Sequence, residues 1–200
     1  MFRLILDSST KLMWIGLVKN NELIDHYTRV AKRDHAKYMV DAIDNLLAKN
    51  NVKVKDLSEI VVGSGPGSYT GLRVAGMTSK MLAYTLNIPL YKVSSIFFLT
   101  SGYKGKVLGM IDARRNQYFT GIYEGINTIK EDELMLYDDI LSLEEYNNYK
   151  VIKIGENNYK IDVSKIIKKM QLVKDIHDYV PNYLRKTEAE MNLWNQERRN

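Results

Sequence analysis

The residues with the clearest chemical potential form a glycine-rich loop that directly follows the apolar run Ile60–Val62. Gly63 to Arg73 reads Gly-Ser-Gly-Pro-Gly-Ser-Tyr-Thr-Gly-Leu-Arg, a composition that excludes the interior of a helix or strand. A helical pattern follows, so the loop joins a strand to a helix, where backbone amides can hold a phosphate or another anion. The residues predicted to contact such an anion are Gly65, Gly67, Ser68, Thr70, Gly71 and Arg73.

The spacing within this loop argues against the two common phosphate-binding motifs. No Lys follows the last glycine, as a P-loop requires, and the glycines do not match the dinucleotide fingerprint. The alternative is a tight turn whose glycines let the next helix approach its neighbour closely. Spacing alone favours the tight turn over the anion site.

Other groups that could catalyse a reaction are scarce. The chain has no cysteine, which excludes disulfides and a thiolate nucleophile, and its three histidines are His26, His35 and His177. No Gly-x-Ser-x-Gly elbow is present to support a serine hydrolase. Because the remaining candidates do not converge on one site, we predict that the chain has no catalytic residue and binds no metal by itself.

Two polar stretches stand where an apolar run ends. Residues 7–10 read Asp-Ser-Ser-Thr, and residues 112–115 read Asp-Ala-Arg-Arg. For Asp112, Arg114 and Arg115, a turn with solvated charges and a contact to a partner or a phosphate are equal alternatives.

The composition is that of an ordinary globular protein, with 200 residues, 45% of them hydrophobic and 26% charged. Lys and Arg exceed Asp and Glu by 13 to 8 in residues 1–100 and equal them, 16 to 16, in residues 101–200. This excess is thinner than the basic stripe of a nucleic-acid-binding protein. Asp7 comes too early for a signal peptide, and no apolar run approaches the ~20 residues of a membrane span, so we expect a cytoplasmic protein.

A pattern of three strands opens the chain and returns 105 residues later. The first copy has strands at Leu4–Leu6, Met13–Val18 and Leu23–Val30, separated by short polar turns. The matching positions are Leu6-Asp7 with Ile111-Asp112, Trp14 with Phe119, Gly16 with Gly121, Leu17 with Ile122, and Ile24 with Ile129. One constant offset through a whole three-strand unit indicates duplication, and a chance alignment of apolar runs is the alternative.

Two helices accompany the first copy. The first is amphipathic, with apolar residues at helical spacing: Ala36, Met39, Val40, Ile43, Leu46 and Leu47. The second, from about Thr70 to Leu86, has Lys80 as its only charge after Val74 and carries small residues along one side: Ala75, Gly76, Ser79 and Ala83. A helix that is apolar nearly all round is buried on more than one face, either by its own fold or by a partner.

Weaker sequence signals predict the remaining strands and helices. We expect strands at Pro89–Val93 and Val151–Ile154, a short helix that Ser94 or Ser95 caps and that runs to Leu99, and helices at Leu141–Tyr149, Ile161–Met170 and Thr187–Arg199. Three strands, a helix, a strand, a loop and a helix, then repeated, describe an α/β protein of the ribonuclease-H-like or actin-like ATPase (ASKHA) fold. The predicted organisation is a first lobe over residues 1–102, a reduced second lobe over 103–185 and a C-terminal helix or tail over 186–200.

The stretch Gly63–Arg73 resembles the GPGS(F/Y)TGLR signature of the bacterial TsaB (YeaZ) family. Supporting matches occur in family order at residues 6–10, His35, residues 112–115 and residues 181–185. The resemblance implies a non-catalytic paralogue of TsaD. It would join TsaD and the small ATPase TsaE in making threonylcarbamoyladenosine (t6A) at position 37 of tRNAs that read codons beginning with A. ATP and metal would then be held by the partner subunits, and tRNA would be met only through the complex.

The resemblance also carries expectations for the sites. Residues 7–10 keep the acidic residue of an actin-like ATPase but lack the glycine that lets the backbone approach a phosphate. The paralogue has two metal-binding histidines four residues apart, whereas here His35 is followed by Met39, a poor ligand for hard or borderline ions.

A four-helix contact with the paralogue, or with a second copy when the paralogue is absent, is implied for the helices at 35–48 and 70–86. The residues expected in this interface are His35, Met39, Ile43, Leu46, Val74, Met77 and Met81. The first alternative is a self-sufficient ATPase or kinase of the same fold. A metallopeptidase and an independent tRNA-binding module are weaker alternatives.

Overall fold

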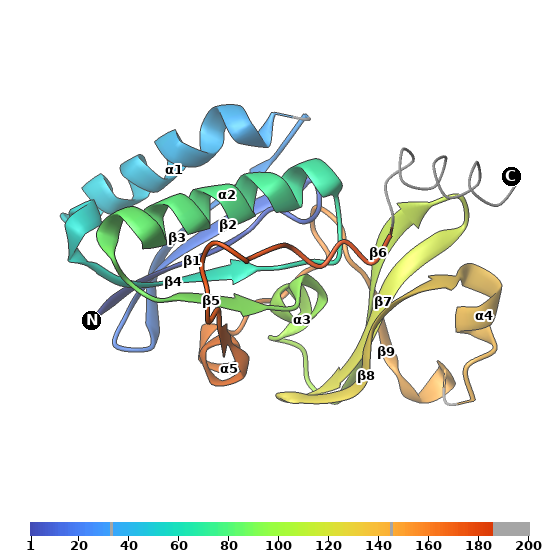
Figure 1. Ribbon diagram of the computed structural model, residues 1–200. Helices are drawn as coiled ribbons and strands as arrows, with labels where there is room; N and C mark the ends of the chain where they lie inside the picture. The colour runs from blue at the N-terminus through green and yellow to red at the C-terminus, as the bar shows by residue number, and fades with distance from the viewer. Residues whose placement is uncertain (33, 145, 186–200) are drawn as a thin grey trace, which may run out of the picture.

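Two β-sheets built on the same plan stand side by side in the computed structural model, with helices on their outer faces and between them (Figure 1). The structure describes residues 1–32, 34–144 and 146–185, so the helix predicted at Thr187–Arg199 lies outside the described residues. Among the described helices, none combines the length and the apolar character needed to cross a bilayer.

The first sheet has the strand order β10-β5-β4-β1-β2-β3. Strands β1, β2 and β3 form the predicted antiparallel meander, while β4 runs parallel to β1 and β5 parallel to β4. The elements of this half are β1 (Phe2–Asp7), β2 (Leu12–Lys19), β3 (Glu22–Val30), α1 (His35–Lys49), a 3-10 turn η1 (Val54–Asp56), β4 (Leu57–Gly63), α2 (Tyr69–Leu86), β5 (Leu90–Val93) and α3 (Ser95–Thr100).

The second sheet has the order β8-β7-β6-β9, which repeats the order β3-β2-β1-β4 of the first sheet. Its elements are β6 (Lys106–Arg114), β7 (Gln117–Glu124), β8 (Asn127–Leu136), α4 (Tyr137–Leu141), a 3-10 turn η2 (Tyr146–Asn148), β9 (Lys150–Lys153), α5 (Val163–Lys169) and β10 (Gln171–Leu172). The predicted repeat is therefore present in the topology. The register differs by one residue, because Gly16 pairs with Ile5 whereas Gly121 pairs with Gly109.

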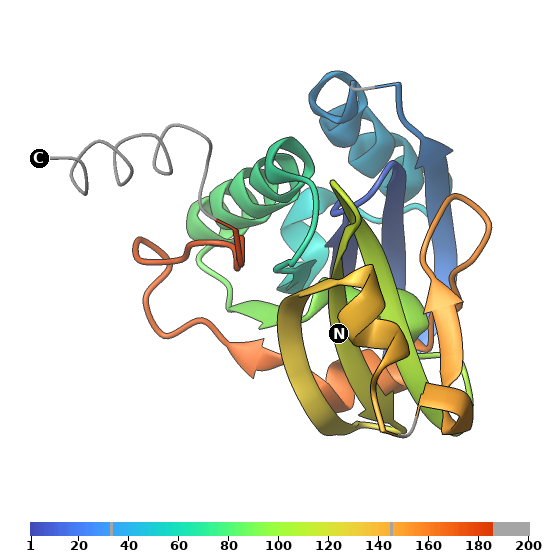
Figure 2. The same cartoon turned by 90° about the vertical axis from the view of Figure 1, so that its right-hand side faces the viewer.

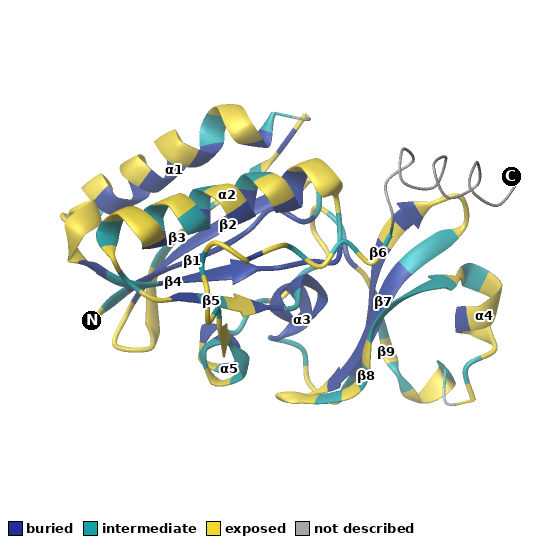
Figure 3. Cartoon of the chain, in the orientation of Figure 1, coloured by how far each residue is buried: buried dark blue, intermediate teal, exposed yellow. Residues whose placement is uncertain are grey.

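The apolar residues separate into layers on either side of the first sheet (Figure 3). Helices α1 and α2 lie side by side on one face, and α1 buries its apolar stripe there. The opposite face packs against α3, whose residues are all buried, and against the second sheet. Ser94 caps α3 by accepting a hydrogen bond from the Phe97 amide, as predicted.

The helix predicted at Leu141–Tyr149 is wrong. Helix α4 ends at Leu141, and the chain continues through the 3-10 turn η2. The reason lies in the spacing of Leu143, Tyr146 and Tyr149, which pack against the outer core of the second sheet at intervals of three residues. Their backbone bonds, Tyr146 N to Leu143 O and Tyr149 N to Tyr146 O, have the same interval, which suits a 3-10 geometry rather than an α-helix.

Residues 103–185 were predicted to form the second lobe, but the last part of this range packs on the first sheet. After α5 the chain returns to the first sheet, where β10 pairs with β5. We call residues 173–185, which follow β10, the strap. Figure 2 shows that the strap lies along α2 on the side away from α1. Residues Tyr179, Pro181 and Tyr183 alternate with the more exposed Val180, Asn182 and Leu184, as in an extended chain packed on one face.

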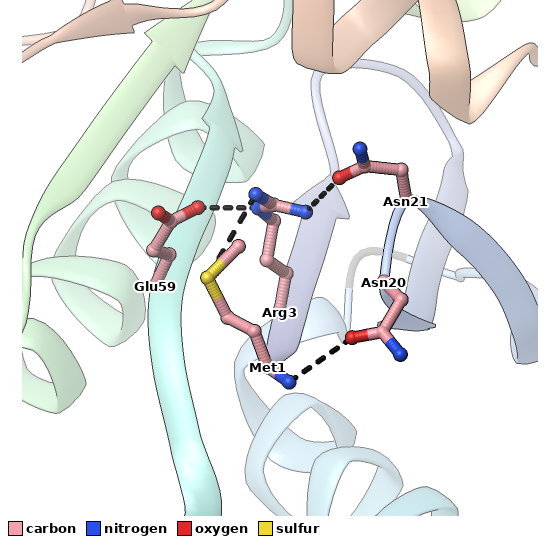
Figure 4. Close-up of polar contacts among 5 residues, drawn as sticks. All are labelled: Met1, Arg3, Asn20, Asn21 and Glu59. Carbon is pink, nitrogen blue, oxygen red and sulfur yellow. Dashed lines mark hydrogen bonds and ion pairs between the residues drawn. The ribbon is translucent and has the colours of Figure 1, made fainter.

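At the end of the first sheet that lies opposite the glycine loop, an ion pair links β1 to β4 (Figure 4). The guanidinium of Arg3 on β1 is buried and donates through Nε to the Glu59 carboxylate on β4. It also donates through Nη1 to Asn21 Oδ1 in the β2–β3 turn, at 2.6 Å. One cation therefore links three segments of the sheet.

Replacing Glu59 with Leu should lower the free energy of unfolding by about 3 kcal/mol, because it leaves the buried Arg3 charge without its carboxylate. Urea denaturation measures the change. The double variant Arg3→Met/Glu59→Leu removes both charges and should recover most of the loss. A double variant as unstable as the single one would contradict this account.

Candidate functional site

The glycines of the loop at residues 63–71 make room for other parts of the same chain. A Cβ atom at Gly67 would clash with the Ser9 carbonyl oxygen, and one at Gly71 with the Ser8 carbonyl oxygen. At Gly63 a Cβ would clash with the Asp7 carboxylate. The loop thus packs directly on the residues that follow β1, which supports the tight-approach interpretation of its glycines.

Backbone amides of the loop that were predicted to contact an anion have partners within the chain. The Gly65 amide donates to Ser95 Oγ at 2.9 Å, and the Ser68 amide donates to the Ser9 carbonyl at 2.6 Å. Ser68 caps α2, since its hydroxyl accepts from the Gly71 amide at 3.4 Å. Of the predicted contacts, Ser68, Thr70 and Arg73 remain exposed.

Asp7, the acidic residue of the expected nucleotide site, is completely buried. Its Oδ1 accepts from the Ser9 amide at 2.9 Å and the Ser9 hydroxyl at 2.7 Å, and its Oδ2 accepts from the Ser95 hydroxyl at 2.6 Å. Burial raises the pKa of the Asp7 carboxyl, while the hydrogen bonds from Ser95 and Ser9 oppose the rise. This carboxyl holds the loop after β1 against α3 and does not face an open cleft.

The strap crosses the glycine loop and reaches the second sheet. The Asn182 amide donates to the Ser64 carbonyl at 2.7 Å, and a Cβ at Gly65 would clash with the Asn182 carbonyl oxygen. At the end of the strap, Arg185 Nη1 donates a hydrogen bond to the Ala113 carbonyl oxygen on β6 at 2.8 Å, so the strap contacts both lobes. Of the groups that a nucleotide phosphate could meet here, the amides of Gly65 and Ser68 are therefore already bonded within the protein.

Three residues predicted for a partner interface lie in the core instead. Met39, Ile43 and Leu46 pack between α1 and the first sheet and are nearly inaccessible. His35 is only 7% exposed, and its Nε2 lies 2.9 Å from the Thr10 carbonyl oxygen. The prediction for these four is wrong because they belong to the side of α1 that faces the interior, whereas Ala36 and Val40 of the same predicted stripe stay exposed.

Helix α2 keeps an apolar stripe on the outside. Met77 is 55% exposed, Met81 63% and Tyr84 63%, whereas Val74 is half-buried. The other sides of α2 are covered by the sheet, by α1 and by the strap, whose Tyr179 and Pro181 lie against Gly76. Tyr84 and Val40 were not among the residues predicted for the interface, although Val40 is 64% exposed on α1. Val40 was placed in the apolar stripe of α1, and no sequence signal indicated that either residue faces outward.

Residues 112–115 form the end of β6 and the tight turn to β7. Asp112 Oδ1 accepts from the Arg114 amide at 2.7 Å, so part of the motif shapes the turn. Arg114 and Arg115 are both exposed.

A buried polar cluster joins the lobes behind the glycine loop. The Tyr123 hydroxyl donates to Asp132 Oδ1 at 2.6 Å and lies 3.0 Å from the Ser94 Oγ at the start of α3. Gly121 leaves room for this pair, since a Cβ there would clash with both side chains. Burial raises the pKa of Asp132 to about 6, against hydrogen bonds from Ser94 and Tyr123 that lower it.

Comparison with known families shows to which family this chain belongs. A family model described as "TsaD: tRNA N6-adenosine threonylcarbamoyltransferase" matches residues 26–176. The chain belongs to this family. Within it, the chain is 29% identical over 218 aligned residues to the tRNA threonylcarbamoyladenosine biosynthesis protein TsaB of Bacillus subtilis, a match that covers 94% of this chain and 95% of the relative.

Solved structures agree with this assignment. YeaZ from Pseudomonas aeruginosa is 28% identical with a TM-score of 0.59, over 67% of this chain and 64% of that one. A second structure, titled an uncharacterised protein with similarity to peptidase YeaZ from Pseudomonas aeruginosa, has a TM-score of 0.75 at 20% identity and covers 92% of this chain and 99% of its own. The predicted TsaB (YeaZ) resemblance and the predicted actin-like α/β fold are both confirmed.

Gly71→Ala should destabilise the fold by about 3 kcal/mol, because the new methyl group must displace the backbone of Ser8. The matched control is Gly155→Ala, where a Cβ meets nothing within 4 Å. That control should change the free energy of unfolding by less than about 0.5 kcal/mol. Thermal and urea unfolding of both variants measure the difference, and equal stability would show that the close approach at Gly71 is not required.

The raised pKa of Asp132 predicts a pH dependence of stability. A carboxyl whose folded pKa is near 6, above its usual 3.8, stabilises the fold in its neutral form, and this contribution disappears as pH rises through 6. Asp132→Asn keeps an acceptor for Tyr123 without the charge. Relative to the unchanged protein, the variant should gain roughly 3 kcal/mol between pH 4 and pH 7.

Urea unfolding at several pH values measures this gain as a difference curve. The exposed carboxylate Asp139 provides a control, because Asp139→Asn should leave the difference curve nearly flat over the same range. A flat curve for Asp132→Asn would mean that Asp132 is not desolvated as described.

Proposed function

We propose that this chain is a non-catalytic subunit of the machinery that makes t6A in tRNA, and that it docks a TsaD-like paralogue through α2. Its family and its TsaB relatives, whose names specify threonylcarbamoyladenosine biosynthesis, support the pathway. The observation that carries the docking surface is the exposed stripe of Met77, Met81 and Tyr84 on a helix whose other sides are already covered.

The composition of this stripe suits a protein partner. Met77, Met81 and Tyr84 follow one another at intervals of four and three residues, so their side chains form one ridge along the helix. Methionine side chains adapt to partners of different shape, and an aromatic ring adds a large contact area. The neighbouring α1 presents Val40 toward solvent but otherwise mostly polar and charged residues, so α2 forms the centre of the contact.

A scaffold role, rather than catalysis, follows from the interior of the first lobe. Asp7 and the amides of Gly65 and Ser68 are bonded within the protein, and the strap covers the loop. The alternative, a self-sufficient ATPase or kinase, needs these groups free to meet a phosphate. We infer that ATP and metal are held by the partner subunits.

The wider assembly follows from the same proposal. The partners are the TsaD-like paralogue and a TsaE-like ATPase, tRNA enters as the substrate of the complex, and the location is the cytoplasm. Alone, the chain would pair with a second copy through α2, because an exposed apolar ridge along a two-fold axis contacts its own equivalent.

The double variant Met77→Glu/Met81→Glu should weaken binding of the TsaD-like paralogue from the same cell at least about tenfold, because two charges replace the centre of an apolar contact. Both side chains are exposed, so the monomer should stay folded. Size-exclusion chromatography with light scattering, followed by titration calorimetry, measures the complex.

Leu141→Glu on α4 is the matched control, because Leu141 is an exposed apolar residue on the other lobe. This control should bind the paralogue as the unchanged protein does. Equal affinity of all three proteins would exclude α2 as the docking surface, and measurable ATP turnover by the chain alone would favour the ATPase alternative.

A further inference from the structure

The second sheet lacks a counterpart of β5. In the first sheet β5 pairs with the outer side of β4, and β9 takes the position of β4 in the repeated plan. In the part of the chain that the structure describes, no strand pairs with the outer side of β9. One edge of the second sheet is therefore open where the same plan is closed in the first sheet.

The outer side of β9 carries backbone groups that the ladder with β6 does not use. The Ile154 amide, just after β9, donates to the Met110 carbonyl on β6 at 2.8 Å. Backbone groups of alternate residues point to the same side of a strand, so Ile152 also faces β6, whereas Val151 and Lys153 face outward. These two residues present their N–H and C=O groups along the open edge.

The two lysines of β9 do not shield this edge, although lysine side chains commonly protect edge strands. Lys153 Nζ lies 4.7 Å from the centroid of the Tyr137 ring and 5.9 Å from that of the Tyr118 ring, and Tyr118 belongs to β7 on the far side of β6. Lys150 Nζ lies 4.8 Å from the centroid of the Tyr103 ring, in the segment that leads into β6. Both ammonium groups are therefore drawn toward the sheet and away from the open edge.

The side chains of β9 determine what an added strand must carry. Val151 packs on the outer core of the second sheet and Ile152 on the core between the lobes, so apolar residues fit opposite these two. Lys150 and Lys153 flank them, and side chains of opposite charge on neighbouring strands attract each other. In an antiparallel pair of β9 strands from two copies, Lys150 would stand opposite Lys153, which disfavours a second copy as the occupant.

Acidic residues of the chain itself leave this pair of lysines largely unpaired. Residues 146–155, which include β9, contain no Asp or Glu. The acidic residues that flank this segment in the sequence are Glu144, Glu145 and Glu156. Glu156 pairs with Lys11 at 3.8 Å, and Asp138 and Asp139 belong to α4, which packs against β8 at the opposite edge of the sheet. An acidic segment from outside the chain would therefore meet a complementary charge.

We propose that the open edge of β9 binds an extended acidic segment of a partner protein, which adds to the second sheet as an antiparallel strand. Backbone hydrogen bonds to Val151 and Lys153 supply affinity, and carboxylates opposite Lys150 and Lys153 supply selectivity. This edge lies on the second lobe, apart from the ridge of α2 (Figure 1). The inference therefore goes beyond the docking proposed above and does not depend on it.

The probe is the synthetic peptide acetyl-Thr-Glu-Val-Val-Glu-Thr-amide, and the control peptide has Lys in place of both Glu residues. In an NMR titration of the full chain at millimolar peptide, the acidic peptide should shift the resonances of residues 150–153, and the control peptide should not. The Val151 and Lys153 amides should exchange with deuterium more slowly when the acidic peptide is bound, because they then donate to it. The Ile152 amide, which faces β6, should exchange at an unchanged rate.

The variant Lys150→Glu/Lys153→Glu should bind the acidic peptide about tenfold more weakly and should bind the control peptide instead. The matched control is Lys37→Glu/Lys55→Glu, which changes the net charge equally at two exposed lysines of the first lobe. This control should change the affinity for the acidic peptide less than about twofold. A further variant, Val151→Pro, removes an outward N–H without touching the bonds to β6 and should abolish binding.

Several results would overturn the proposal. They are an acidic peptide that leaves residues 150–153 unshifted, equal binding of both peptides, and slow exchange of the Val151 and Lys153 amides in the free chain, which would mean that the edge is already covered. A dimer of the unchanged chain that Val151→Pro dissociates would make a second copy the occupant and would also overturn it. Met77→Glu/Met81→Glu should bind the acidic peptide normally, so this test and that of the proposed function can fail independently.

Discussion

The close contact between the residues after β1 and the glycine loop is the constraint on which the rest of the structure depends. The carbonyls of Ser8 and Ser9 lie where side chains of the loop would otherwise stand, so the start of α2 is pressed against β1. The buried Asp7 carboxyl extends the contact through Ser95 to α3, which lies between the lobes. These backbone and side-chain contacts thus link the start of α2 and the start of α3 to the end of β1.

The polar residues around the glycine loop have structural roles in this arrangement. Buried polar groups need hydrogen-bond partners. Ser9 and Ser95 donate to the Asp7 carboxyl, and they also accept from the Ser68 and Gly65 amides. The Asn182 amide of the strap donates to the Ser64 carbonyl, so the strap takes part in the same network.

The family, the two-sheet topology and most of the helices and strands could be predicted from the sequence, because specific local signals indicate them. The glycine loop, the serine cap of α3 and the strand alternation each have a direct geometric cause. The interface residues of α1 were misassigned because a stripe containing Met39 and Ile43 looks the same whether a sheet or a partner covers it. The position of the strap was not predicted, because the residues that it contacts, Gly76 and Ser64, are distant from it in the sequence. The alternation of Tyr179, Pro181 and Tyr183 with polar or exposed residues was a signal that could have indicated an extended chain packed on one face.

The return of the strap to the first lobe has a mechanical consequence. The chain passes between the lobes through residues 101–105, comes back after α5, and then reaches over again when Arg185 grips the Ala113 carbonyl. Proteins of two lobes joined by a single connection open and shut about it like a hinge, whereas these repeated crossings brace the lobes against rotation. We therefore expect the ridge of α2 and the turn between β6 and β7 to keep a fixed position relative to each other.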